Sequence, residues 1–125
     1  MSEASENMKQ RTKQFALRMI RMMKSLPENP VARVIGSQAL RSGTSVGANY
    51  RAACRARSPA DFCSKMGIVE EETDESVYWM ELMAEAELFP KKRLEPLMQE
   101  ADEILAITVS SIKTARKRIK PKRSS

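Results

Sequence analysis

Apolar residues recur at alternating intervals of three and four positions along almost the whole chain. Met8, Phe15 and Met22 are seven residues apart near its start, and Leu105 and Ile112 repeat the interval near its end. This spacing places apolar side chains on one face of an α-helix. Alternating patterns typical of strands are nearly absent. The periodicity therefore predicts an all-α protein.

Prolines divide the periodic pattern into four parts. Asn29-Pro30 and Ser58-Pro59 each join a capping residue to a proline, a combination typical of the first turn of a helix. Helices are predicted over residues of about 6–26, 31–57, 59–88 and 94–120, followed by a short basic tail at 121–125. Short connections make successive helices antiparallel. We expect one domain over residues 1–125, an up-down-up-down antiparallel four-helix bundle.

Composition argues against most enzyme classes. The 125 residues carry a formal net charge of +6 and include no histidine, two cysteines and four glycines. Without histidine there is no Ser-His-Asp or Cys-His nucleophile and no imidazole base. Cys54 and Cys63 are too few for a zinc site or a disulfide scaffold. They flank one turn, and a reducing cytoplasm favours two free thiols over a redox pair. We expect a protein that is not an enzyme and has no metal or cofactor.

The beginning of the chain and its apolar stretches indicate the compartment. Residues 1–13 are polar and charged, so no apolar core of a signal peptide follows the start. The uncharged stretches are far shorter than the roughly 18 apolar residues that a spanning helix needs. A cytoplasmic location is expected.

Charge is distributed unevenly among the four predicted helices. The third is strongly acidic, whereas the first, second and fourth are basic. Two interpretations remain open. The acidic helix complements its basic neighbours within one bundle, or it meets a basic face of another subunit.

The second predicted helix has small and polar residues at the centre of its expected core stripe. Ser42, Ser45 and Asn49 occupy positions where large apolar residues are usual, while Gly43 and Gly47 thin the opposite side. Buried polar groups need partners, because an unpaired one costs about 1–3 kcal/mol. Close helix packing and a polar network are therefore expected here.

The partners of this network are predicted on the third helix. If the turn is centred on Ser58, Arg41 is level with Glu75, Ser45 with Glu71 or Glu72, and Gln38 with Tyr78 or Trp79. A guanidinium opposite a carboxylate fork is a strong side-chain pair. A catalytic site is the alternative, but no base is present to activate a nucleophile. The predicted structural polar network consists of Gln38, Arg41, Ser45, Asn49, Glu72, Glu75 and Trp79.

Basic residues accumulate at the C-terminus without an intervening acid. They favour a phosphate-binding arm, although cations also stabilise helix C-termini and improve solubility. The aromatic residues fall mainly on helix seams, so no stacking platform is expected, and recognition would be limited to the nucleic-acid backbone. The predicted nucleic-acid contacts are Lys113, Arg116, Lys117, Arg118, Lys120, Lys122 and Arg123.

Two long segments resemble a known family. Residues 35–51 read IGSQALRSGTSVGANYR, and Ala60-Asp61-Phe62 is followed by Glu72, Glu75 and Tyr78-Trp79. Both are similar to the bacterial four helix bundle protein family, also called the 23S rRNA intervening-sequence protein family. The resemblance covers about residues 8–116. Departures from the family pattern are Ala52, where Glu is usual, and Glu70-Glu71, where Leu-Lys is usual.

The resemblance implies an up-down bundle whose known members assemble as pentameric barrels. Some members are encoded within insertions of 23S rRNA genes, and most have no assigned function. The family is also related to the accessory protein of diversity-generating retroelements, which binds nucleic acid and a reverse transcriptase.

Wide apolar faces on the first and fourth helices bear on assembly. They carry Ala16, Ile20 and Met23, and Ile104, Ile107 and Val109. Such faces indicate subunit contacts or, alternatively, packing against two neighbours within one bundle. The resulting hypothesis is a non-enzymatic homo-oligomer, a pentamer as first guess, that contacts RNA or DNA without sequence specificity. The alternative is a scaffold that binds a protein partner and no nucleic acid.

Overall fold

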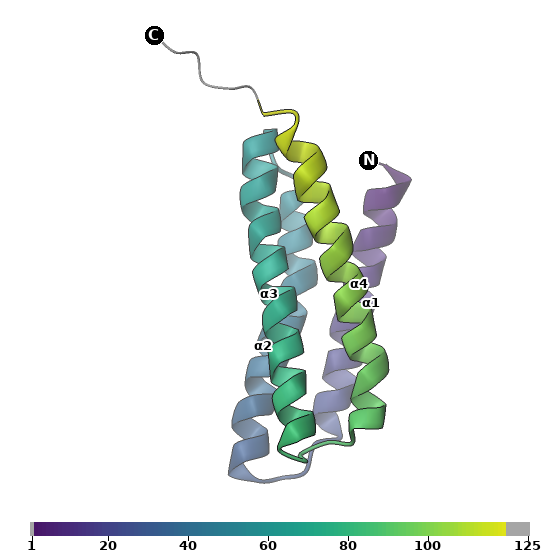
Figure 1. The fold of residues 1–125 in the computed structure, drawn as a ribbon, viewed down its shortest axis with the longest axis vertical. Helices are drawn as coiled ribbons and strands as arrows, with labels where there is room; N and C mark the ends of the chain where they lie inside the picture. The colour runs from purple at the N-terminus through teal and green to yellow at the C-terminus, as the bar shows by residue number, and fades with distance from the viewer. Residues whose placement is uncertain (1, 120–125) are drawn as a thin grey trace.

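The computed structural model describes residues 2–119 (Figure 1). Within that range it contains no strand, and each helix runs antiparallel to the next one along the chain. The predicted fold class, an all-α up-down-up-down four-helix bundle, is confirmed. The helices are α1 (Glu3–Lys24), α2 (Pro30–Ala53), α3 (Pro59–Glu85) and α4 (Lys91–Arg116).

Side-chain caps begin the first three helices. The side chains of Ser2, Asn29 and Ser58 each accept a hydrogen bond from the backbone N–H three residues later. Pro30 and Pro59 follow two of these caps at the first helical position, where no N–H is needed. Because Ser2 caps α1, that helix starts earlier than the predicted residue 6. Helix α4 has no side-chain cap.

The observed helix ends differ from the predicted ones. Helix α2 stops at Ala53 rather than 57, because Ser58 must be extended before Pro59 and the chain first tightens into a turn. Helix α3 stops at Glu85 rather than 88, since Glu87 takes a left-handed conformation with φ 58°. Helix α1 stops at Lys24 rather than 26, shortly before Pro27.

Helix α4 begins at Lys91, three residues before the predicted start, and contains Pro96. Leu94 and Leu97 are buried on either side of this proline. Their packing offsets the backbone hydrogen bond that Pro96 cannot donate. The helix ends at Arg116 rather than 120, and the predicted tail at 121–125 lies outside the described residues.

The heptad positions form the core. Its largest fully buried side chains come from all four helices, and methionine is the commonest residue type among them. Unbranched methionines adapt to the irregular space between helices. The set includes Phe15, Met19, Met66, Met80, Met83, Leu94 and Ile104.

Glycines of α2 bring this helix close to α1. A Cβ atom added at Gly43 would lie 2.7 Å from Cγ of Met19, and one at Gly47 would lie 3.2 Å from Oγ1 of Thr12. Neither space can hold a methyl group without movement of the neighbour. The small residues noted in the sequence therefore permit the close approach of the two helices.

Candidate nucleic-acid interface

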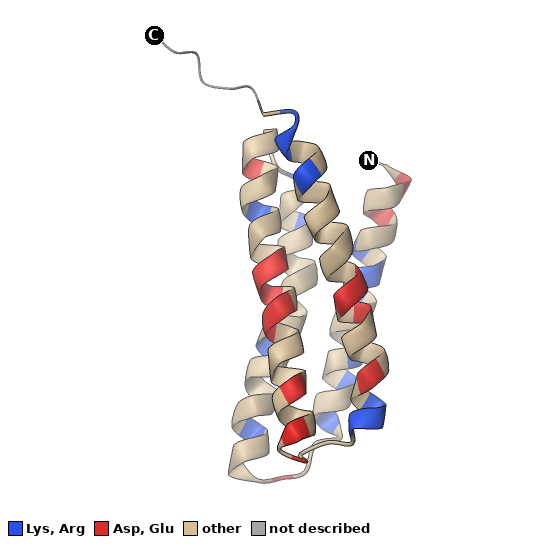
Figure 2. Ribbon diagram, viewed as in Figure 1, with Lys and Arg blue, Asp and Glu red and all other residues tan. Residues whose placement is uncertain are grey.

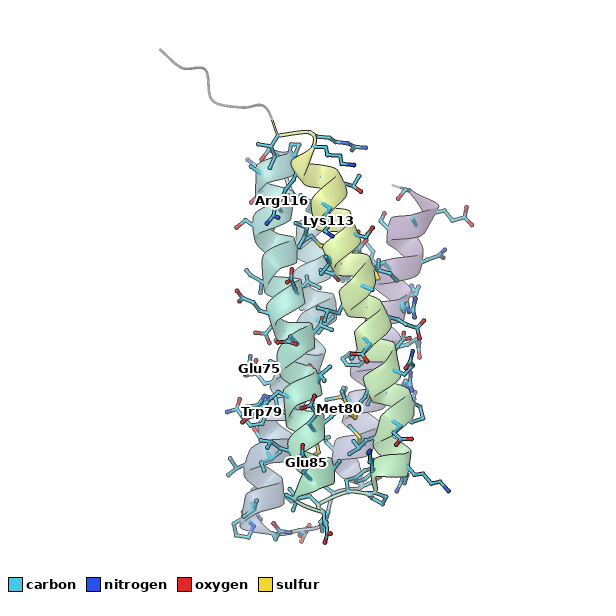
Figure 3. All side chains as sticks on the ribbon, in the orientation of Figure 1. Glu75, Trp79, Met80, Glu85, Lys113 and Arg116 are labelled. Carbon is cyan, nitrogen blue, oxygen red and sulfur yellow. The ribbon has the colours of Figure 1, made fainter. Side chains whose placement is uncertain are left out.

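Arg41 is the centre of a polar network between α2 and α3. Its Nη1 lies 3.1 Å from a carboxylate oxygen of Glu72, its Nη2 contacts Glu75, and its Nε donates to Gln38 at 3.3 Å. The hydrogen bond with Glu75 is the largest cause that raises the pKa of Arg41 above its usual value. Figure 3 labels Glu75 and Trp79, which share this part of α3.

The remaining members of the predicted network have local partners. The Ser45 hydroxyl donates to the carbonyl of Arg41 at 2.7 Å, and Asn49 Nδ2 donates to the carbonyl of Ser45 at 2.9 Å. Trp79 differs from the expectation, because its indole nitrogen is buried without a hydrogen-bond partner. The amide oxygen of Gln38 accepts from Arg41 instead, at 3.3 Å, and the hydroxyl of Ser76 donates to that of Ser42 across the seam at 3.0 Å.

A second interhelical network was not found in the sequence. Arg11 of α1 bonds Glu100 of α4 through two nitrogens, both at 2.7 Å, and Nη2 also lies 2.9 Å from Glu103. The hydrogen bond from Arg11 holds the pKa of Glu100 below its usual value. No turn joins α1 directly to α4. The residue numbers alone therefore could not show which residues of these two helices lie level with each other.

The C-terminal cations of the described range are exposed. Lys113 and Arg116 lie near the end of α4 (Figure 3), and Lys117 and Arg118 follow them. None of these side chains forms an ion pair with another described residue. The other predicted contacts, Lys120, Lys122 and Arg123, lie outside the described residues.

The C-terminus of α2 adds cations that the sequence analysis did not assign to this site. Because α2 and α4 run in the same direction, their C-termini lie at the same end of the bundle. Arg51, Arg55 and Arg57 are exposed there and make no ion pair within residues 2–119. We call the combined surface the basic end: Arg51, Arg55, Arg57, Lys113, Arg116, Lys117 and Arg118.

Acidic groups at the same end are few. Asp61 is paired with Lys65 at 2.9 Å, and this hydrogen bond lowers the pKa of Asp61. Glu6 lies 3.4 Å from Lys9, while Glu3 is exposed in the first turn of α1. The basic end therefore retains an excess of positive charge.

Acidic groups instead follow the length of α3 (Figure 2). Glu70, Glu71 and Asp74 line a groove of about 280 Å³ together with Leu105 and Val109 of α4. The acidic groove is thus separate from the basic end, although exposed cations such as Arg21, Lys24 and Arg33 also lie near the opposite end of the bundle. A polyanion would be attracted to the basic end and repelled by this α3–α4 face.

The described part of the chain holds no candidate metal site and no candidate membrane span. Among residues 2–119 no group of three or more acidic or cysteine side chains is placed to hold a metal ion. Cys54 and Cys63 are half-buried free thiols. No described helix has both the length and the apolar character needed to cross a membrane.

These features define the class: a four-helix bundle with a cluster of exposed cations at one end, none of them in an ion pair within residues 2–119, and an acidic third helix. The chain belongs to the 23S rRNA-intervening sequence protein family, whose family model matches residues 5–110. The resemblance inferred from the two sequence segments is thereby confirmed.

A solved structure supports the assignment. It is a protein of unknown function from the S23 ribosomal protein family of Bacteroides thetaiotaomicron, 37% identical to this chain, with a TM-score of 0.80. The similarity covers 85% of this chain and 98% of that one. No curated protein matches the chain.

Proposed function

We propose that this protein is a non-enzymatic, cytoplasmic module that binds the phosphate backbone of RNA or DNA through its basic end. The observation that carries the proposal is the collection of exposed, unpaired cations from the C-termini of α2 and α4. Lysine and arginine in such clusters are the electrostatic footprint of nucleic-acid binding.

The names of similar proteins agree with this proposal. The family is described by the intervening sequence of 23S rRNA, and the similar structure is assigned to a ribosomal protein family. Neither description states what is bound. They favour RNA as the first nucleic acid to be tested.

The physical basis of binding would be the release of counterions from phosphates. Each phosphate neutralised on duplex DNA contributes about −0.9 to the slope of log K against log salt concentration. Such binding is independent of sequence. The acidic α3–α4 face would orient the bundle, because its carboxylates keep that side away from the polyanion.

We also propose that the chain assembles with copies of itself, with a ring of five as the first guess from the family resemblance. The faces expected from the sequence are covered in part within the bundle: Ile104 is buried and Ile20 and Met23 are half-buried, whereas Ile107 is 37% exposed. Val31 and Val34 are instead 57% and 64% exposed at the start of α2. Contact there would leave the basic end free.

Fluorescence anisotropy with labelled RNA and duplex DNA of unrelated sequences tests the proposal. The full chain should bind all of them, with affinity falling steeply as salt rises. A truncation that removes residues 117–125 leaves α4 complete, and it should weaken binding to every sequence and flatten the salt slope. Absence of binding at 50 mM salt would refute the proposal.

A protein-interaction scaffold is the second candidate. The exposed side chains of Val31, Val34 and Tyr78 favour it, because apolar surface of this kind is often covered by a partner. Under this alternative, nucleic-acid binding would be weak and would barely change on truncation. The same titrations therefore separate the two functions.

A further inference from the structure

A cleft opens at the end of the bundle that carries the cations. Helix α1 makes far less contact with α4 than with α2, and its first turns stand apart from the end of α4 (Figure 1). The cleft has a volume of about 540 Å³ and is lined by residues of all four helices. That volume lies within the range of pockets that take small organic groups.

The inner walls of the cleft are apolar and include two aromatic rings. Met8, Ala53 and Ile107 line it together with Tyr50, which is 6% exposed, and Phe62, which is half-buried. Burial is the largest cause that raises the pKa of Tyr50, followed by a hydrogen bond with Cys54. The phenol therefore stays neutral at physiological pH.

Polar groups occupy other parts of the lining. Ser110, Ser111 and Thr114 supply hydroxyls from α4, and Ser2 and Ser5 supply them from the start of α1. Hydroxyl groups donate and accept, so they can bond the varied edges of a heterocycle. The cleft thus joins flat apolar surfaces to adaptable hydrogen-bonding groups.

One cation lines the cleft, and two others adjoin a lining residue in the sequence. Arg118 lines it directly, and Arg55 and Arg57 flank Ala56, which also lines it. The nearby carboxylate of Glu6 is held by Lys9 at 3.4 Å. A ligand that enters here would place an apolar heterocycle inside and negative charge at the rim.

We propose that the cleft accepts an unpaired base of a single-stranded nucleic acid, whose flanking phosphates are bound by Arg55, Arg57 and Arg118. This inference rests on the proposed function and adds that the protein prefers single strands to duplexes. A base held in a duplex cannot enter the cleft unless it is first unstacked and unpaired, which costs free energy. An unpaired base avoids that cost and gains contact with the apolar walls, including the half-buried ring of Phe62, a base-binding surface that the sequence analysis did not expect.

Filling the cleft tests the proposal. Ser110→Trp adds a large ring to an exposed lining position of α4, and Ser64→Trp adds the same ring to an exposed position of α3 outside the cleft. Binding is measured with a 12-nucleotide single strand and the matching duplex. The wild type and Ser64→Trp should favour the single strand by about tenfold, within the range that base stacking supports.

In Ser110→Trp we expect this preference to disappear while duplex affinity stays within about twofold, because the cations are unchanged. A preference that survives in Ser110→Trp would overturn the inference, as would equal binding of both nucleic acids by the wild type. If the wild type binds neither the single strand nor the duplex, the proposed function is refuted as well. Free AMP should compete only weakly with the single strand. If AMP binds more tightly than the strand, the cleft is a mononucleotide site and the inference is overturned.

Discussion

At the scale of single residues, the two arginine networks differ in their environments. The side chain of Arg41 is 48% exposed, whereas Arg11 and Glu100 are 32% and 18% exposed. Exposed ion pairs contribute little to stability because water screens them. Arg41 therefore fixes how α2 and α3 align, while the better shielded Arg11–Glu100 pair contributes more to holding α1 against α4.

Glu100→Gln should lower the free energy of unfolding by about 1 kcal/mol at pH 7, because a charged hydrogen-bond partner of Arg11 becomes neutral. The pKa of Glu100 is lowered in the folded protein, so its stabilisation is present above the unfolded carboxyl pKa of about 4.3 and is lost as pH falls further. Urea unfolding at several pH values should show the two proteins converging below about pH 4.

Glu95→Gln is the matched control for this experiment. Glu95 is exposed in the same helix and makes no ion pair within the described range. Its substitution should change stability little at any pH. A loss in Glu100→Gln that persists undiminished at pH 3 would contradict the assigned ion pair.

At the scale of helices, much could be predicted from sequence because the signals are local. The caps at Asn29 and Ser58 mark the starts of α2 and α3, and the short turn between these helices places Arg41 level with Glu75. The ends of the helices were predicted less accurately. At the end of α3, for example, the left-handed conformation is taken by Glu87 and not by a glycine, which would have marked the position in the sequence. The contact of Arg11 with Glu100 and the cleft depend on the relative placement of α1 and α4, which no local signal encodes.

The close packing of α1 on α2 leads to a second prediction. Gly43→Ala should destabilise the protein by about 1 kcal/mol, because a Cβ would lie 2.7 Å from Met19 and the cost of overpacking exceeds the gain in helix propensity. Gly67→Ala should stabilise it by about 0.5–1 kcal/mol, since Gly67 is inside α3 with nothing within 4 Å of its added Cβ. Chemical denaturation measures both. A Gly43→Ala protein as stable as Gly67→Ala would argue against tight packing of these helices.

At the scale of the whole molecule, apolar and basic surfaces lie at opposite ends of α2. Val31 and Val34 are exposed near its start, and Arg51 and Arg55 near its C-terminus. Self-association at one end and nucleic-acid binding at the other are therefore compatible. An oligomer would also present several basic ends to one polyanion and raise the overall affinity.

Light scattering tests this assembly. The full chain at micromolar concentration should have a mass several times its 14.1 kDa, and Val34→Glu should reduce that mass because it places a charge in the apolar surface. Val34→Ile, which keeps the surface apolar, should leave the mass unchanged. A monomeric wild type would contradict the proposed oligomer.

Matched charge neutralisation tests the basic end most directly. Replacing Arg51, Arg55 and Arg57 by Gln removes three cations from it; replacing Arg21, Lys24 and Arg33 by Gln removes the same charge from exposed positions near the opposite end. The salt dependence of binding to duplex DNA is measured for both variants and the wild type. The first variant should bind at least about tenfold more weakly at 50 mM salt, with a salt slope flatter by about 2 to 3, while the second keeps a slope within about 1 of the wild type. Equal losses in the two variants would mean that net charge alone drives binding, which would contradict a nucleic-acid interface at the basic end.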